Sequence, residues 1–264
     1  MYAFDVARPT SVADAIALLH DDEDAQPLAG GQTLIPTLKA RLAMPSTLVS
    51  LGAIDEIRGV CVTDAGAVAI GGGTTHAEVA RAAADHYPAL AALAGQIGDP
   101  AVRNRGTIGG SLANNDPSAC YPAAVLASGA TIVTTGGRIA ADDFFQGMFA
   151  TALDEAALIT SVEFPVPEAA AYVKFAQPAS RFAMVGVYVA RFSDSVRVAV
   201  TGASEDGVFR WTEAEAALTA SFDAQSVAGL ALPSDGMIAD VHASAAYRAH
   251  LVGVITKRAV VAAG

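Results

Sequence analysis

Apolar and polar positions follow a helical period and then a strand period at the start of the chain. Apolar residues over 12–19 are spaced to line one side of a helix, which Thr10 or Ser11 can cap. After an acidic stretch, short apolar runs alternate with glycines and a second helical stretch. The pattern predicts a βαβ unit, with strands at 26–28 and 47–51 and a helix carrying Leu34, Ile35, Leu38 and Leu42 between them.

The middle of the chain combines a hairpin, helices and a polar stretch. Alternating residues predict a hairpin over 60–70, and Thr75 with Glu78 has the spacing of a capping box that opens an Ala-rich helix. A further helix is expected over 88–95. From about 97 to 119 the chain is dense in Gly, Asn, Asp and Pro, which predicts a long polar loop before an Ala-rich helix and a strand. Loops of that length inside a compact domain usually have a function.

The pattern changes again near "FPVPEAAA", where two prolines indicate a linker. Beyond it, 172–175, 186–192 and 196–202 alternate like strands of an antiparallel sheet, and 213–263 is expected to be mainly helical. The predicted division is therefore a first domain over 1–165, with lobes of about 1–55 and 56–165, and a second domain over 166–264.

Composition excludes several classes of protein. The 264 residues carry a formal charge of −11 and no basic stripe, so nucleic-acid binding is not expected. The chain shows no apolar segment of membrane-spanning length and no signal peptide, so a cytoplasmic location is the default expectation. Cys61 and Cys120 are the only cysteines, which excludes a disulfide scaffold and an iron–sulfur cluster held by this chain alone. Cys61 is expected to be a small core residue in a strand.

Two glycine-containing loops are the candidates for ligand binding. In Ala29–Leu34 the paired glycines permit close backbone approach, and free N–H groups with the side chains of Gln32 and Thr33 favour an anion. The stretch "GTIGGS" at 106–111 has the same composition, with Thr107 and Ser111 as hydroxyl donors. Each loop alone is also explained as a turn, whereas two together favour a dinucleotide. No G-x-G-x-x-G or P-loop motif is present.

Longer segments carry a family resemblance. "PLAGGQTLIPTLKARLAMPSTLVSL", "IGDPAVRNRGTIGGSLANNDPSACYPAAVLASGATI" and "KFAQPASRFAMVGVYV" resemble the FAD-binding subunits of molybdenum hydroxylases. That family includes the medium subunit of carbon monoxide dehydrogenase and the FAD-binding subunit of xanthine dehydrogenase. The resemblance covers essentially the whole chain. It implies an α+β fold with a two-lobed FAD-binding domain of the vanillyl-alcohol oxidase and UDP-N-acetylenolpyruvoylglucosamine reductase type, followed by a smaller domain with an antiparallel sheet and helices.

The resemblance also implies which residues bind FAD. The first loop would hold the pyrophosphate, the second would form a facing wall, two isoleucines would lie near the isoalloxazine, and a polar segment would contact the cofactor. The residues are Ala29, Gly30, Gly31, Gln32, Thr33 and Leu34, then Thr107, Gly109, Gly110 and Ser111, then Ile97 and Ile159, and finally Asn114, Asn115 and Asp116. Cys120 departs from the family pattern, which has an Asp that meets the cofactor. Cys is a weak hydrogen-bonding partner, so its contact is expected to be altered.

The function implied is electron transfer. By resemblance, substrate is oxidised in a molybdopterin-binding large subunit, and electrons pass through two [2Fe–2S] clusters of a small subunit to the FAD of this chain and then to an external acceptor. The expected assembly is a dimer of heterotrimers, with no catalytic residue and no metal site in this chain. A stand-alone flavin reductase of the same fold and a non-catalytic nucleotide-binding assembly module remain alternatives.

Overall fold

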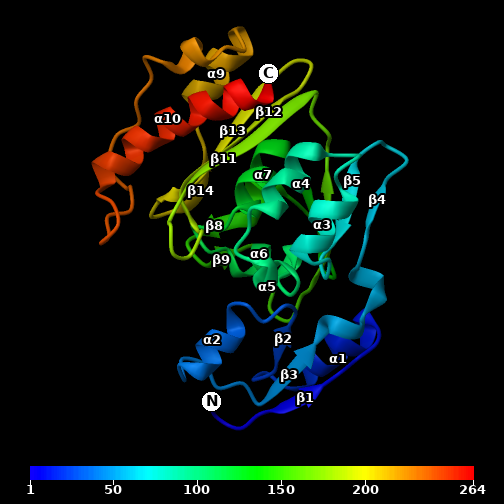
Figure 1. Ribbon diagram of the computed structural model, residues 1–264. Coiled ribbons are helices and arrows are strands. Elements are labelled where there is room, and N and C mark those ends of the chain that lie inside the picture. Colours follow the sequence, from blue (N-terminus) through cyan, green and yellow to red (C-terminus); the bar gives the residue numbers. More distant parts are fainter.

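The computed structural model describes residues 1–264. Its N-terminal part, at the bottom of Figure 1, is a small parallel sheet with strand order β1-β3-β2. Ser11 accepts a hydrogen bond from the Asp14 N–H and so caps the first helix. The predicted βαβ unit is confirmed. The elements are β1 (Asp5–Ala7), α1 (Val12–Asp21), β2 (Gln26–Leu28), α2 (Leu34–Lys39) and β3 (Thr47–Ser50), followed by the 3-10 turns η1 (Leu51–Ala53) and η2 (Asp55–Ile57).

The second helix is shorter than its apolar pattern predicts. It ends at Lys39, and Arg41 has a left-handed φ of 60°, a conformation that cannot continue a helix. Leu42 consequently lies 78% exposed rather than on the buried side of the helix.

The second sheet is antiparallel, and one of its faces packs against helices to form the main apolar core. Its strand order is β4-β5-β10-β6-β7, and α3, α4, α6 (Ile108–Asn114) and α7 contribute to the 29-residue apolar cluster packed on it. Cys61 lies in the predicted strand, but on an exposed edge, so its assignment to the core was wrong. The elements are β4 (Val60–Val62), β5 (Val68–Gly71), α3 (His76–Ala82), α4 (Pro88–Gly95), α7 (Tyr121–Ser128), β6 (Thr131–Thr134), β7 (Gly137–Ala140), α8 (Ala141–Phe144), β8 (Phe145–Gly147), β9 (Ala150–Thr151) and β10 (Ile159–Phe164).

The predicted polar loop at 97–119 contains two short helices, so that prediction was wrong in part. The side chain of Asp99 caps α5 (Pro100–Arg103), and the side chain of Thr107 caps α6 (Ile108–Asn114). Two consecutive glycines make the intrinsic helix propensity of α6 poor. Its first turn is held instead by hydrogen bonds to residues 72 and 74 of another segment, which a single-sequence pattern does not reveal.

The third sheet is an antiparallel meander whose two faces are both covered. Helix α7 packs on the face that carries Tyr172 and Tyr188, and α9 with α10 packs on the valine-rich opposite face (Figure 1). The predicted helical C-terminal third is confirmed only in part, because 228–244 is mostly irregular. The elements are β11 (Ala169–Ala176), β12 (Ala183–Arg191), β13 (Val196–Ser204), β14 (Gly207–Arg210), α9 (Thr212–Ala220), the 3-10 helix η3 (Ala224–Val227) and α10 (Ala245–Ala263).

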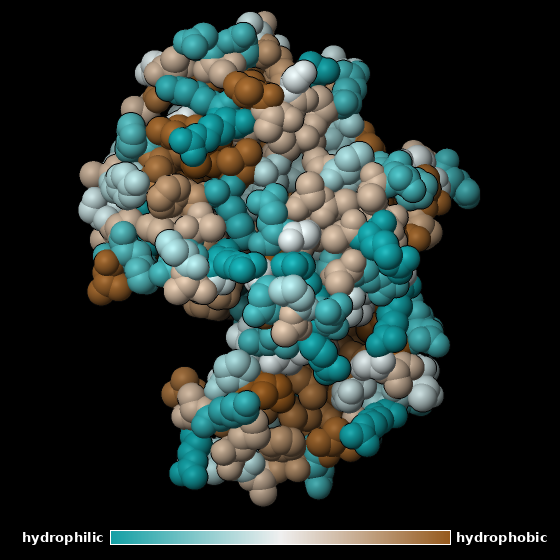
Figure 2. Space-filling model, viewed as in Figure 1, coloured by the Kyte–Doolittle hydropathy of each residue, from teal (hydrophilic) through white to brown (hydrophobic).

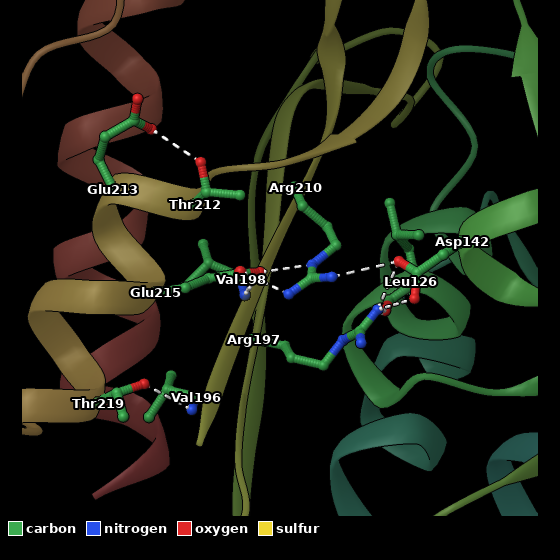
Figure 3. Close-up of polar contacts among 10 residues, drawn as sticks. All are labelled: Leu126, Asp142, Val196, Arg197, Val198, Arg210, Thr212, Glu213, Glu215 and Thr219. Atoms are coloured by element: carbon green, nitrogen blue, oxygen red, sulfur yellow. Dashed lines mark hydrogen bonds and ion pairs between the residues drawn. The ribbon is translucent and has the colours of Figure 1, made fainter.

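A network of hydrogen bonds and ion pairs connects the third sheet to α8, the short helix that follows β7 of the second sheet (Figure 3). Asp142 of α8 accepts hydrogen bonds from Arg197 at 2.7 Å and Arg210 at 3.4 Å. Arg210 also pairs with Glu215 of α9 at 2.6 Å, and Glu215 accepts from the Val198 N–H. The chain passes between the two sheets at residues 165–168, and the division into domains there remains a prediction. No helix is long and apolar enough to span a membrane.

Candidate functional site

The loop between β2 and α2 presents a run of unused backbone donors. None of the backbone N–H groups from Ala29 to Leu34 donates a hydrogen bond to another group of the chain, although the side-chain amide of Gln32 donates to the Gly30 carbonyl at 3.4 Å. Gly31 has a φ of 71°, which turns the backbone so that this run can form. Successive backbone N–H groups left free in this way make a concave site for an anion, and no side-chain carboxylate fills it here.

The second glycine loop uses its backbone donors differently. The N–H of Ile108 donates to the Thr74 carbonyl at 3.1 Å, and the N–H of Gly109 donates to the Gly72 carbonyl at 2.8 Å. The N–H groups of Gly110 and Ser111 both donate to Thr107, one to its side chain and one to its carbonyl. The N–H groups of residues 108–111 are therefore satisfied within the chain. What this loop offers a ligand is hydroxyl groups, notably that of Ser111, which bonds to no other group of the chain.

The two loops lie against each other. A methyl group built on Gly30 would collide with the Arg105 carbonyl oxygen and the Gly106 backbone, and one built on Gly110 would lie 3.6 Å from the Ala29 side chain. Glycine is required at residue 30 because backbone meets backbone there. In Figure 2 the surface is hollowed between the N-terminal part, which carries α2, and the larger body above it.

Gly72 extends the same contact surface and was missed in the sequence. A methyl group on Gly72 would collide with the Ile159 carbonyl, and one on Gly109 would lie 2.7 Å from the Gly72 carbonyl oxygen. The signal in the sequence is the triple glycine at 71–73. Gly72 brings Ile159, expected near the isoalloxazine, next to the second loop.

His76 connects the second loop to the start of α7. Its side chain is buried, its Nε2 faces Gly106, and its ring centroid is 5.3 Å from that of Tyr121. Burial, with a smaller effect from the positive charge of Arg103, lowers the pKa of His76 to about 4. The imidazole is therefore neutral near pH 7, and its Nδ1 has no partner.

A second group of the predicted residues surrounds Lys174 of β11. Its ammonium donates to the Gln96 carbonyl at 2.9 Å, beside Ile97, and to the Arg181 carbonyl at 2.8 Å, and its Nζ lies 3.6 Å from the Cys120 Sγ. Arg103 fixes the Ile97 segment by donating to the Ile97 carbonyl at 3.0 Å and to its neighbour. Sequence reasoning missed Lys174, although it lies in one of the segments that carry the family resemblance.

The polar segment Asn114–Asp116 is largely occupied by the fold. The side-chain amide of Asn115 donates to the Gly147 and Ala150 carbonyls at 2.8 and 2.9 Å, which ties α6 to the β8–β9 hairpin. Asp116 accepts a hydrogen bond from the Ser118 N–H and closes a turn. Asn114 is half-buried at the end of α6. Their contact with a cofactor remains a prediction.

The described geometry fits FAD better than it fits an acid–base or metal site. The free N–H run suits a pyrophosphate, and Ile97 and Ile159 supply apolar surface. No group of three or more His, Cys, Asp or Glu side chains is placed to hold a metal ion.

Comparison with known proteins gives the same picture. Residues 2–167 match the family described as the FAD binding domain in molybdopterin dehydrogenase. The chain is 37% identical to the nicotine 6-hydroxylase medium subunit of Paenarthrobacter nicotinovorans, covering 98% of this chain and 96% of that one. It is 34% identical to the carbon monoxide dehydrogenase medium chain of Hydrogenophaga pseudoflava, with the same coverage.

A solved structure agrees along the whole length. A chain of reconstituted CO dehydrogenase from Oligotropha carboxidovorans superposes with a TM-score of 0.89 at 32% identity, covering 99% of this chain and 98% of that one. The mixed α/β architecture with its antiparallel sheets is therefore that of a carbon monoxide dehydrogenase medium subunit. The chain belongs to the family of FAD-binding medium subunits of molybdenum hydroxylases, and it is an oxidoreductase subunit.

Proposed function

We propose that this chain passes electrons from the [2Fe–2S] clusters of a partner subunit, through FAD, to an external acceptor. The observation that carries the assignment is the run of free N–H groups from Ala29 to Leu34, packed against the second glycine loop. A pyrophosphate is the anion whose size and charge suit such a run, and the family binds FAD.

Different residues of the site would bind different parts of FAD. Residues 29–34 bind the pyrophosphate through backbone N–H groups, and the hydroxyls of Thr107 and Ser111 donate from the facing loop. Ile97 and Ile159 pack against the ring system. FAD, when bound, supplies the electron-accepting chemistry. The chain itself binds it, orients it and shapes its electrostatic surroundings.

The partners proposed are a molybdopterin-binding large subunit and a [2Fe–2S] small subunit, in a dimer of heterotrimers. The relatives named above are medium subunits or chains, and this chain has only two cysteines, too few to hold clusters itself. The fold would then be the two-lobed type of vanillyl-alcohol oxidase, with a domain boundary near residue 165.

The test has two parts. The visible spectrum of the purified chain, with identification of the nucleotide released on denaturation, should show one FAD per chain. Co-expression with candidate large and small subunits should yield a complex in which reduction of the clusters bleaches the flavin band. Bound FAD with no iron–sulfur partner would favour a stand-alone reductase, and a chain that takes up no FAD in any assembly would contradict the proposal.

A further inference from the structure

Lys174 carries a positive charge that no acidic side chain balances. Its three N–H groups face the Gln96 carbonyl, the Arg181 carbonyl and the Cys120 sulfur, so the ammonium is held in one place. The structure contains six ion pairs, and Lys174 takes part in none of them. A thiol is a weak acceptor and contributes no formal charge when protonated.

The surroundings of Lys174 add positive potential to this place. Cys120 lies at the start of α7, where the backbone N–H groups of Tyr121 and Ala123 donate to no group of the chain although these residues are fully buried. The unpaired end of a helix adds partial positive charge. The hydroxyl of Tyr172, beside Cys120, is also buried without a partner. Together these groups stabilise negative charge on a molecule bound near Ile97 and Cys120.

We propose that Lys174 raises the reduction potential of the FAD bound by this chain, and that Cys120 keeps its charge uncompensated. The inference rests on the proposed FAD site, because it places the ring system beside Ile97. Reduced FAD carries more negative charge than oxidised FAD, so a fixed cation stabilises the reduced form. Lys174 acts through its charge, since all of its N–H groups are already used; it is a tuning residue and takes no part in bond making.

The size of the effect follows from the interaction of two charges near a protein surface. At a separation on the order of 6 Å and an effective dielectric constant of about 20, loss of the cation should lower the ratio of reduced to oxidised FAD about a hundredfold at a fixed potential. For a two-electron couple, a hundredfold change corresponds to about 60 mV.

Two substitutions remove the uncompensated charge by independent routes. Lys174→Met deletes the cation, and Cys120→Asp keeps Lys174 but gives it a carboxylate partner. Both should lower the midpoint potential of FAD in the full-length chain by about 60 mV, the value for a hundredfold change. Because Cys120→Asp leaves the bonds to Gln96 and Arg181 available, it answers the objection that Lys174→Met only loosens the fold.

Three controls separate charge from structure. Lys257→Met removes a similarly half-buried lysine on α10 and should leave the potential unchanged. Lys174→Arg should retain most of the wild-type value, and Cys120→Ser should shift it much less than Cys120→Asp does. Potentials are measured against reference dyes after the FAD content of each variant is determined.

The outcomes distinguish this inference from the proposed function. If wild type and variants bind FAD but Lys174→Met and Cys120→Asp leave the potential unchanged or raise it, the tuning role is wrong and the FAD assignment stands. If wild type binds no FAD alone or with its partners, both fail together.

Discussion

The two glycine loops have similar sequences and opposite uses of their backbone. From Ala29 to Leu34 the backbone N–H groups donate to nothing in the chain, whereas from Ile108 to Ser111 every backbone N–H donates within the chain, the first two to residues 72 and 74 and the last two to Thr107. The glycines differ accordingly. Gly31 turns the first loop so that its donors are free, and Gly109 lets the second loop lie on Gly72. Glycine-rich composition therefore does not by itself mean an anion site; the hydrogen-bond accounting decides which loop has donors to offer.

Gly30→Ala should break the arrangement most strongly, because it affects both loops at once. The new methyl group would collide with the Arg105 carbonyl, which is backbone and cannot rotate away. We expect the FAD affinity to fall by about 3 kcal/mol, or more than a hundredfold, the upper end of the usual cost of overpacking. FAD titration measures the loss.

Gly95→Ala is the matched control for that substitution. No atom lies within 4 Å of the added methyl group, and Gly95 is the last residue of α4. FAD affinity and stability should stay the same or improve slightly. Equal losses in both variants would show that contact between the loops is unimportant.

Acid should destabilise the packing of the second loop, because it protonates the buried imidazole of His76. Its folded pKa of about 4 lies below the unfolded value of about 6.5, so the stabilisation is complete above pH 6.5 and is lost as the pH falls toward 4. Between pH 6.5 and 4.5 the free energy of unfolding should drop by about 2 kcal/mol from this group. Urea unfolding as a function of pH measures it.

His76→Gln should remove most of that pH dependence, because the glutamine does not titrate. His20→Gln, at an exposed residue of α1, is the matched control and should leave the pH profile as in the wild type. A wild-type stability that is flat from pH 6.5 to 4.5 would contradict a buried neutral imidazole beneath the loop.

Gly109→Ala tests the role of the second loop in packing, because it should lower the stability of the chain even when no FAD is bound. Its methyl group would lie 2.7 Å from the Gly72 carbonyl oxygen, so the second loop must shift. The free energy of unfolding of the FAD-free chain should fall by about 1 to 2 kcal/mol. Urea unfolding without FAD would show it, and an unchanged midpoint would mean that the second loop is not held by this contact.

Ser111→Ala should give the smallest effect. In contrast to Gly109→Ala, it should weaken FAD binding without lowering the stability of the FAD-free chain. The Ser111 hydroxyl bonds to nothing in the chain, so the stability of the FAD-free protein should not change. Loss of one donor to the cofactor should lower FAD affinity by about 1 kcal/mol, roughly fivefold. FAD titration and urea unfolding of the same variant test this. A loss of stability without a loss of FAD affinity would contradict the assignment of Ser111 as a donor to FAD.

Sequence patterns predicted local structure well wherever the pattern was regular. The βαβ unit, the Thr75 cap and the meander strands follow from spacing within about ten residues, and the structure confirms them. Helix α6 could not be predicted in that way. Its glycines are unfavourable for a helix, and its first turn exists because residues 72 and 74 accept its N–H groups.

The candidate site shows the same limit. Composition located both loops, but only the folded chain shows that one leaves its donors free. Lys174 was invisible in the sequence, because its importance depends on Gln96 and Cys120, which lie 78 and 54 residues away. Contacts between distant segments, rather than residue type, define the site.

The small core of the N-terminal part bears on how the protein is made. Only seven buried residues form its apolar cluster, and one of them, Leu158, comes from the segment just before β10. The strands that flank the first glycine loop leave the ribosome early, yet they complete their core only after Leu158 has been synthesised. A ligand that binds the folded state alone adds stability by mass action. FAD is therefore expected to favour the last step of folding as well as to serve the finished enzyme.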